Sequence, residues 1–134
     1  MYKLTWILVA FFAFTLSVLA APIPVPDDSQ DLDKRATHVG RGTWYIPGLG
    51  NCGWTNNRNQ LVVAMPKSLY DQNNGSNCGQ MVQISFGGKS VTAKMVDSCP
   101  GCGPNDLDMS PATFGALASL DVGVIKASWH FLKK

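Results

Sequence analysis

Residues 96–109 read Val-Asp-Ser-Cys-Pro-Gly-Cys-Gly-Pro-Asn-Asp-Leu-Asp-Met. This stretch holds two of the four cysteines and three of the nine acidic residues of the chain. An alternating strand pattern leads directly into Asp97, and a Pro-Gly pair between the two cysteines then turns the chain. A strand that delivers a carboxylate to a pinned turn holds that group at the rim of a cleft. The sequence therefore predicts that Asp97 lies at the centre of the functional surface.

The segment before this stretch predicts a β-hairpin. Residues 81–86 and 89–96 alternate apolar and polar side chains, and the Gly87-Gly88 pair between them forms a two-residue hairpin turn. The remaining expected elements are strands at residues 37–46, 61–65 and 124–131 and helices that begin at Pro66 and, with Ser110 as N-cap, at Pro111. Five or six short strands with two short helices favour a compact β-barrel.

The first 20 residues predict a secretory signal peptide. Lys3 supplies a positive start, residues 7–16 are nearly all apolar, and small residues at Val18 and Ala20 suit signal peptidase. The uncharged run is just long enough to cross a bilayer, but prolines follow at once and no basic cluster stops its transfer. We therefore expect cleavage and no stable membrane anchor.

Residues 21–35 predict an acidic, proline-rich pro-segment. They are too polar to build a core, and they end in the dibasic pair Lys34-Arg35, which resembles the cleavage site of kexin-type proteases. The alternative is an uncleaved, disordered arm. If cleavage occurs, one small domain remains, residues 36–134.

Composition narrows the possible partners and cofactors. The chain carries a formal net charge of +2 without a clustered basic stripe, which gives no support to nucleic-acid binding. An even number of cysteines in a small secreted domain indicates disulfides. A zinc site made of Cys99, Cys102 and His130 would lack a second ligand pair, and a redox-active Cys-x-x-Cys would lack its strand-helix context. We expect a monomer with no metal and no cofactor.

Two features of the loops carry open alternatives. Trp54 precedes a polar stretch, so it serves either as a platform for a ligand or as a cover for the edge of the core. Asn74 begins the sequence Asn-Gly-Ser in a polar loop, which is a sequon for N-glycosylation of a secreted protein.

Several motifs occur in the order typical of one superfamily. They are Gly42-Thr43-Trp44-Tyr45, Gly48-Leu49-Gly50-Asn51-Cys52-Gly53, Leu61-Val62-Val63-Ala64, Asn77-Cys78-Gly79-Gln80, Gly88-Lys89-Ser90-Val91, Val96-Asp97-Ser98-Cys99-Pro100-Gly101-Cys102, Asp106-Leu107-Asp108-Met109-Ser110-Pro111 and Ile125-Lys126-Ala127-Ser128-Trp129. The chain thus resembles the rare lipoprotein A (RlpA)-like group, which is related to barwin and to the first domain of expansins. It is most similar to the small, single-domain secreted fungal members. The resemblance implies a mainly β fold, a disulfide-stabilised six-stranded double-psi β-barrel with two short helices. In the related barwin pattern the counterparts of Cys52 and Cys78 pair, which implies a Cys52–Cys78 bond. The usual partner of Cys99 is absent here, and we expect Cys99 to pair with Cys102.

The same resemblance implies a groove without a complete catalytic pair. Asp97 matches the aspartate that lines the groove throughout the superfamily. Met65 stands where bacterial lytic members carry a histidine, and Ile46 lies where family 45 endoglucanases carry a second aspartate. Asp106 and Asp108 are the nearby carboxylates, and the resemblance assigns the alternate side chains of their strand to fold contacts. Because glycoside cleavage generally uses two carboxyl groups, we expect no glycosidase activity.

Three functions follow as hypotheses. The first is non-catalytic binding of cell-wall polysaccharide in a groove lined by Thr43, Trp44, Tyr45, Trp54, Asp97 and Asp106. The second is a protein-binding module, either a cysteine-protease inhibitor or a host-directed effector, and the third is a glycan-cleaving enzyme that uses Asp97. A purely structural role for Asp97, as acceptor of backbone N–H groups at a tight turn, is the alternative to a functional groove centred on Asp97.

The dibasic site gives a direct prediction. Because flexible, polar segments are the preferred sites of proteolysis, the secreted protein is expected to begin at Ala36. N-terminal sequencing of secreted material checks this, and a mature start at Ala21 or Pro22 would contradict it.

Overall fold

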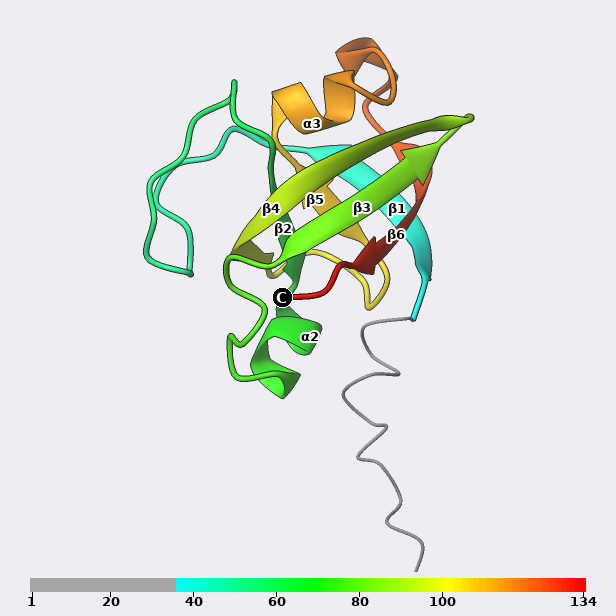
Figure 1. The fold of residues 1–134 in the computed structure, drawn as a ribbon. Helices are drawn as coiled ribbons and strands as arrows, with labels where there is room; N and C mark the ends of the chain where they lie inside the picture. Colours follow the sequence, from blue (N-terminus) through cyan, green and yellow to red (C-terminus); the bar gives the residue numbers. More distant parts are fainter. Residues whose placement is uncertain (1–35) are drawn as a thin grey trace, which may run out of the picture.

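The computed structural model describes residues 36–134, and in this part of the chain six strands close into a barrel (Figure 1). The strands are β1 (His38–Trp44), β2 (Val62–Pro66), β3 (Met81–Phe86), β4 (Lys89–Cys99), β5 (Leu107–Met109) and β6 (Ile125–Phe131). Two short helices, α2 (Lys67–Gln72) and α3 (Pro111–Gly115), and a 3-10 turn (Leu120–Val122) connect them. The predicted six-stranded barrel with two short helices is confirmed. The predicted signal peptide and pro-segment lie outside the described residues.

The barrel combines parallel and antiparallel strand pairs. Its order is β1-β5-β2-β4-β3-β6, in which β1 pairs with β5 and β2 with β4 in parallel, and the other four pairs are antiparallel. Closure leaves no strand edge free to pair with another chain. The short strand β5 lies between β1 and β2, so it brings the chain that follows the Cys99–Cys102 turn into the wall of the barrel.

The core follows the period-two alternation of the sequence. Val82 and Ile84 of β3 and Ala93 and Met95 of β4 are fully buried, as the hairpin pattern predicts. Gly87 and Gly88 adopt φ values of +57° and +80°, which the two-residue turn between these strands requires. β2 is buried at all five positions. It lies between β4 and β5 in the barrel, and α2 packs against it. This agrees with its continuous apolar sequence.

β4 is longer than its sequence pattern predicts. It runs on through Asp97 to Cys99, since its last residues pair in parallel with Met65 and Pro66 of β2. A register shift between Val63 and Ala64 accompanies this pairing. Asp97 therefore lies within a strand and not after its end, which ties its position to the wall of the barrel.

Two disulfides reinforce the described domain. Cys52 is bonded to Cys78 and Cys99 to Cys102, with Cα–Cα distances of 5.6 and 5.4 Å. Both are the expected pairs, and Cys52–Cys78 is the one that the barwin pattern implies. No helix within residues 36–134 combines the length and apolar character needed to cross a membrane.

Candidate functional site

Polar side chains from three strands meet on the wall of the barrel. In the register of β1, β5, β2 and β4, Thr43 lies opposite Asp108, Asp108 opposite Ala64, and Ala64 opposite Asp97. The two aspartates are thus two strand spacings apart, about 10 Å between their Cα atoms. Ala64 lies between them and is small and buried, so its side chain does not separate Asp97 from Asp108. Thr43, Asp97, Asp108 and Tyr45, which follows β1, are called the carboxylate cluster below.

Asp97 anchors a neighbouring loop with one of its oxygens. Its Oδ1 accepts the backbone N–H of Asn51 at 2.8 Å and that of Ser98 at 2.8 Å. Gly50 packs so closely here that a Cβ atom at this position would collide with the carbonyl oxygen of Val96. Asp97 therefore has the structural role of accepting backbone N–H groups, and both of these hydrogen bonds go to Oδ1.

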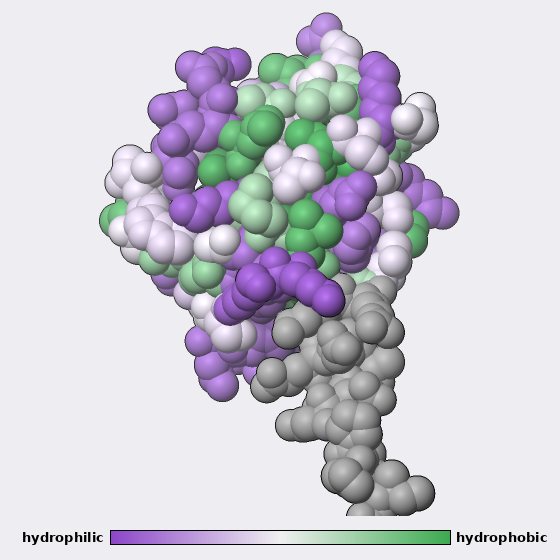
Figure 2. All heavy atoms as spheres, in the orientation of Figure 1, coloured by the Kyte–Doolittle hydropathy of each residue, from purple (hydrophilic) through white to green (hydrophobic). Residues whose placement is uncertain are grey.

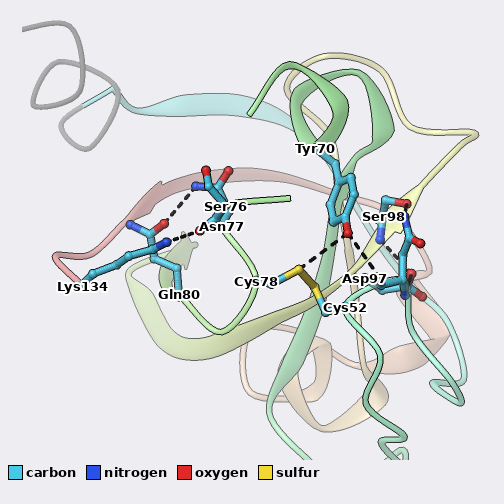
Figure 3. The surroundings of a disulfide bond; sticks show 10 residues. Cys52, Tyr70, Ser76, Asn77, Cys78, Gln80, Asp97, Ser98 and Lys134 are labelled. Atoms are coloured by element: carbon cyan, nitrogen blue, oxygen red, sulfur yellow. Dashed lines mark hydrogen bonds between the residues drawn. A yellow bond between two sulfur atoms is a disulfide. The ribbon is translucent and has the colours of Figure 1, made fainter. Parts of the chain in front are cut away.

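Three further contacts hold the same loop, and Figure 3 shows the Tyr70 side chain and the Cys52–Cys78 disulfide among them. The Tyr70 hydroxyl donates to the backbone carbonyl of Asn51 at 3.3 Å and points toward the Cys52–Cys78 disulfide. The N–H of Cys52 donates to the carbonyl of Val96 at 3.2 Å. Because these contacts come from a helix, a strand and a covalent bond, the loop is fixed relative to Asp97.

Asp108 is half-buried beside a hydroxyl donor. The Thr43 Oγ1 donates to its Oδ1 at 2.9 Å. Burial raises the pKa of Asp108 above its ordinary value, and the negative charge of Asp97 adds to the increase. The hydrogen bonds from Thr43 and from the backbone of Met109 act in the opposite direction and lower this pKa. The carboxyl group of Asp108 therefore sits in a place that does not favour its charge.

Tyr45 brings an unpaired hydroxyl to the two carboxylates. Within residues 36–134, its buried OH has no hydrogen-bond partner, while its backbone N–H donates to the Met109 carbonyl at 2.9 Å. Burial raises the pKa of Tyr45, and the charges of Asp97 and Asp108 raise it further. At neutral pH the group is thus a protonated donor, and leaving such a donor unsatisfied costs about 1–3 kcal/mol.

The other predicted site residues have different surroundings. Trp44 packs against the core and donates its indole N–H to the Leu120 carbonyl at 3.0 Å, so its polar atom is already bonded. Asp106 accepts the backbone N–H of Arg41 and of Gly103, one with each carboxylate oxygen. These contacts stabilise the fold around the start of β5.

Trp54 lies on the loop and not in the carboxylate cluster. Its ring covers Gly79 and has the Lys94 Nζ 4.4 Å from its centroid, a cation–π contact. The side chain is 41% exposed, so part of the ring remains open to solvent. Of the six residues predicted for the groove, the structure gathers Thr43, Tyr45 and Asp97.

Asp108 is the carboxylate of the cluster that the predicted groove leaves out. The alternation from residue 106 to 109 places Asp106 and Asp108 on the same face of β5, and nothing in the sequence separates them. Only the register with β1 shows that Asp108 lies beside Thr43, whereas Asp106 accepts from the turn at Gly103.

Within residues 36–134, no group of three His, Cys, Asp or Glu side chains is arranged as a metal ion would require.

The environment of Asp108 predicts an unusual effect of mutation. Since its pKa is raised in the folded state, the ionised form is less favourable there than in the unfolded chain, so the charge destabilises the fold at pH 7. This penalty shrinks as the pH falls through the raised pKa, because the folded protein then takes up the proton. Asp108→Asn is therefore expected to raise Tm at pH 7. The difference in Tm between variant and wild type should disappear at about pH 3.

Asp97→Asn is the contrasting variant and should lower stability by about 1–2 kcal/mol, because a neutral amide accepts hydrogen bonds less strongly than a carboxylate. Thermal unfolding of both variants between pH 3 and 7 measures these effects. A lower Tm for Asp108→Asn at pH 7 would show that the charge of Asp108 supports the fold.

Comparison with known proteins places this geometry in a family. No protein-family model matches the chain. The allergen Asp f 7 of Aspergillus fumigatus is 41% identical over 105 residues, which are 73% of this chain and 38% of that protein. Its homolog in Arthroderma benhamiae is 34% identical, also over 38% of its length, so the chain spans about two fifths of these two relatives.

A bacterial inhibitor matches over most of both proteins. The papain inhibitor of Streptomyces mobaraensis is 32% identical over 112 residues, 78% of this chain and 78% of the inhibitor. The solved structure of a Streptomyces papain inhibitor superposes with a TM-score of 0.67 and 32% identity, covering 73% of this chain and 96% of the inhibitor.

An expansin shares the same barrel. A mutant expansin of Clavibacter michiganensis, solved in complex with cellohexaose, superposes with a TM-score of 0.66 and 26% identity over 73% of this chain. The match covers 51% of the expansin chain. From its motifs, its closed six-stranded barrel and these relatives, the chain belongs to the RlpA-like double-psi β-barrel superfamily.

Proposed function

We propose that this chain is a secreted, non-catalytic barrel protein that binds cell-wall polysaccharide through the carboxylate cluster. The observation that carries the proposal is the buried hydroxyl of Tyr45, which has no partner within residues 36–134 and whose pKa the charges of Asp97 and Asp108 raise further. A sugar hydroxyl both accepts and donates hydrogen bonds, so it can accept one from the Tyr45 O–H and donate one to a neighbouring carboxylate. The similarity to an expansin solved with cellohexaose supports this class of ligand.

Secretion is part of the proposal. All four cysteines are paired in disulfides, which form and persist in oxidising compartments outside the cytosol. The signal peptide and the dibasic pro-segment predicted for residues 1–35 suit the same route. The proposed mature form is the barrel domain, residues 36–134.

Cleavage of a glycan is the closest competitor to simple binding. Two carboxyl groups, one of them with a raised pKa, are the parts that glycosidases use. Against this, Asp97 already holds two backbone N–H groups. Met65, which stands where lytic relatives have a histidine, is fully buried. We therefore propose binding without cleavage, and the assay includes both readouts.

The binding proposal predicts the effect of two conservative variants. Tyr45→Phe and Asp108→Asn should each weaken adsorption to the polysaccharide about tenfold, roughly 1.4 kcal/mol. Tyr45→Phe removes a hydrogen-bond donor, and Asp108→Asn replaces a charged acceptor with a weaker, neutral one. The measurement is a depletion isotherm of the mature protein on cellulose, chitin and β-glucan. Asp121→Asn, an exposed aspartate on the 3-10 turn, is the matched control and should bind like the wild type.

Two results would count against this proposal. Unchanged adsorption by folded Tyr45→Phe and Asp108→Asn would remove the carboxylate cluster from binding. Release of reducing ends that is lost in Asp97→Asn would replace binding with catalysis. Because Asp108→Asn is expected to keep or raise Tm, its loss of binding would not be explained by unfolding.

A second function, inhibition of a papain-like cysteine protease, is favoured by the loop at residues 47–61. Leu49 is 76% exposed and Trp54 41%, and Leu61 at the end of the loop is also exposed. The upper part of this loop is hydrophilic and its lower part is close to neutral (Figure 2, left). Exposed apolar residues on a loop held by a disulfide and by Asp97 form a preorganised surface, which lowers the entropy cost of binding a protein. A papain inhibitor is among the relatives that match over most of their length.

The loop proposal predicts a different set of sensitive residues. Leu49→Ser and Trp54→Ala should each raise the inhibition constant for papain at least tenfold, because apolar and aromatic anchors dominate such interfaces. Val122→Ser, which alters an exposed apolar residue away from this loop, is the matched control. If papain is not inhibited at all, or if Tyr45→Phe weakens inhibition as much as Leu49→Ser does, the loop proposal is wrong.

A further inference from the structure

A second concave site lies apart from the carboxylate cluster. A cavity of about 380 Å³ lies between α2 and the turn that follows it on one side and the start of β1 and the end of β6 on the other. Its lining includes Leu69, Gln72, Asn73, Asn74, Phe131 and Lys134. None of its lining residues belongs to the carboxylate cluster or to the loop at residues 47–61. It therefore belongs to neither function proposed above.

One wall of this cavity is fixed by a relay of side-chain amides. Asn73 Nδ2 donates to Asn77 Oδ1 at 2.8 Å, and Asn77 Nδ2 donates to Gln80 Oε1 at 2.9 Å. Gln80 Nε2 then donates to the carbonyl of Leu132 at 2.8 Å. Figure 3 shows this side of the domain, where Lys134 reaches across to the Ser76 carbonyl. Since every step of the relay is bonded, the wall keeps its shape without a ligand.

The sequon lies on the rim of the same cavity. Asn74 and Ser76 are both exposed, and both belong to the lining. Asn74 has a φ of +53°, and the Gly75 N–H after it donates to the Tyr70 carbonyl at 3.0 Å, which closes the turn after α2. A group attached to the Asn74 side chain therefore starts at the mouth of the cavity.

The cavity has the chemistry of a site for an N-acetylated sugar. Half-buried Leu69 offers apolar surface to the ring face or the acetyl methyl group, and Phe131, which is 4% exposed, also belongs to the lining. The amides of Gln72 and Asn73 can both donate to and accept from hydroxyl and acetamido groups. The volume lies in the range of sites for small ligands.

We propose that Asn74 carries an N-linked glycan and that its first sugar, an N-acetylglucosamine, packs in this cavity as part of the folded structure. The transfer takes place in the secretory pathway and so rests on the secretion proposed above. The Asn74 Nδ2 forms a bond to C1 of the sugar in place of one N–H, and the lipid diphosphate donor leaves C1 and takes up the proton. The glycan then covers this cavity instead of extending freely into solvent.

The test uses glycoforms of the full chain secreted by a eukaryotic host that performs N-glycosylation. A peptide map should show Asn74 modified in the wild type and in Ser76→Thr, which keeps the sequon, and unmodified in Ser76→Ala. Trimming with an endoglycosidase that leaves one N-acetylglucosamine should preserve Tm. Loss of the whole glycan in Ser76→Ala should lower Tm by on the order of 4 °C.

A displaced sequon supplies the control. Adding Asn59→Ser to Ser76→Ala creates a new Asn-Arg-Ser sequon that begins at Asn57, on the loop at residues 47–61 and outside the lining of the cavity. Its glycan should leave Tm at the value of Ser76→Ala. An unmodified Asn74 in the wild type overturns the proposal, as does an equal Tm for glycosylated, trimmed and unglycosylated forms. Either failure leaves secretion to be judged separately, from the N-terminus of the exported chain.

Discussion

The hydrogen bonds between Asp97 and the backbone of Asn51 and Ser98 connect the two surfaces of this molecule. The Asn51 bond joins the end of β4, which is fixed in the barrel by pairing with β2, to the loop at residues 47–61, and the Ser98 bond lies within β4 itself. The Cys52–Cys78 disulfide closes a separation of 26 residues around the same point, which is expected to contribute roughly 3–4 kcal/mol. A charged acceptor and a covalent bond thus position the loop together. Removing either one would loosen the exposed apolar residues without opening the barrel.

Two groups of the carboxylate cluster lower the stability of the fold when no ligand is bound. Asp108 is held where burial and a second carboxylate oppose its charge, and Tyr45 keeps a buried hydroxyl without a partner in the described part of the chain. A small barrel with a closed core and two disulfides can tolerate such local costs. Groups that weaken the fold but are well placed to bond a ligand are typical of binding and catalytic sites. By contrast, Asp106 has both oxygens bonded and helps the fold.

The sequence predicts the barrel well because period-two patterns and turn residues are local. The hairpin of β3 and β4, the Ser110 cap of α3 and the buried strand β2 all follow from neighbouring residues. The site depends on which strands lie side by side, and parallel pairing between distant strands has no local signal. This is why the predicted groove includes Asp106 and leaves out Asp108. It is also why the sequence pattern ends β4 before Asp97, although β2 extends it to Cys99.

The two proposed functions are physically coupled through Asp97. A ligand that donates a hydrogen bond to Asp97 Oδ2 lowers the negative charge on Oδ1. Because Oδ1 accepts the Asn51 N–H, this weakens the bond that holds the loop. Binding at the carboxylate cluster would then shift the loop only as far as the disulfide and the Tyr70 bond allow. Since both restraints also act on Asn51 and Cys52, a large displacement is excluded by the geometry. A polysaccharide and a protease would therefore meet the loop in nearly the same conformation, and competition between them would arise from overlap of the ligands rather than from a change in the fold.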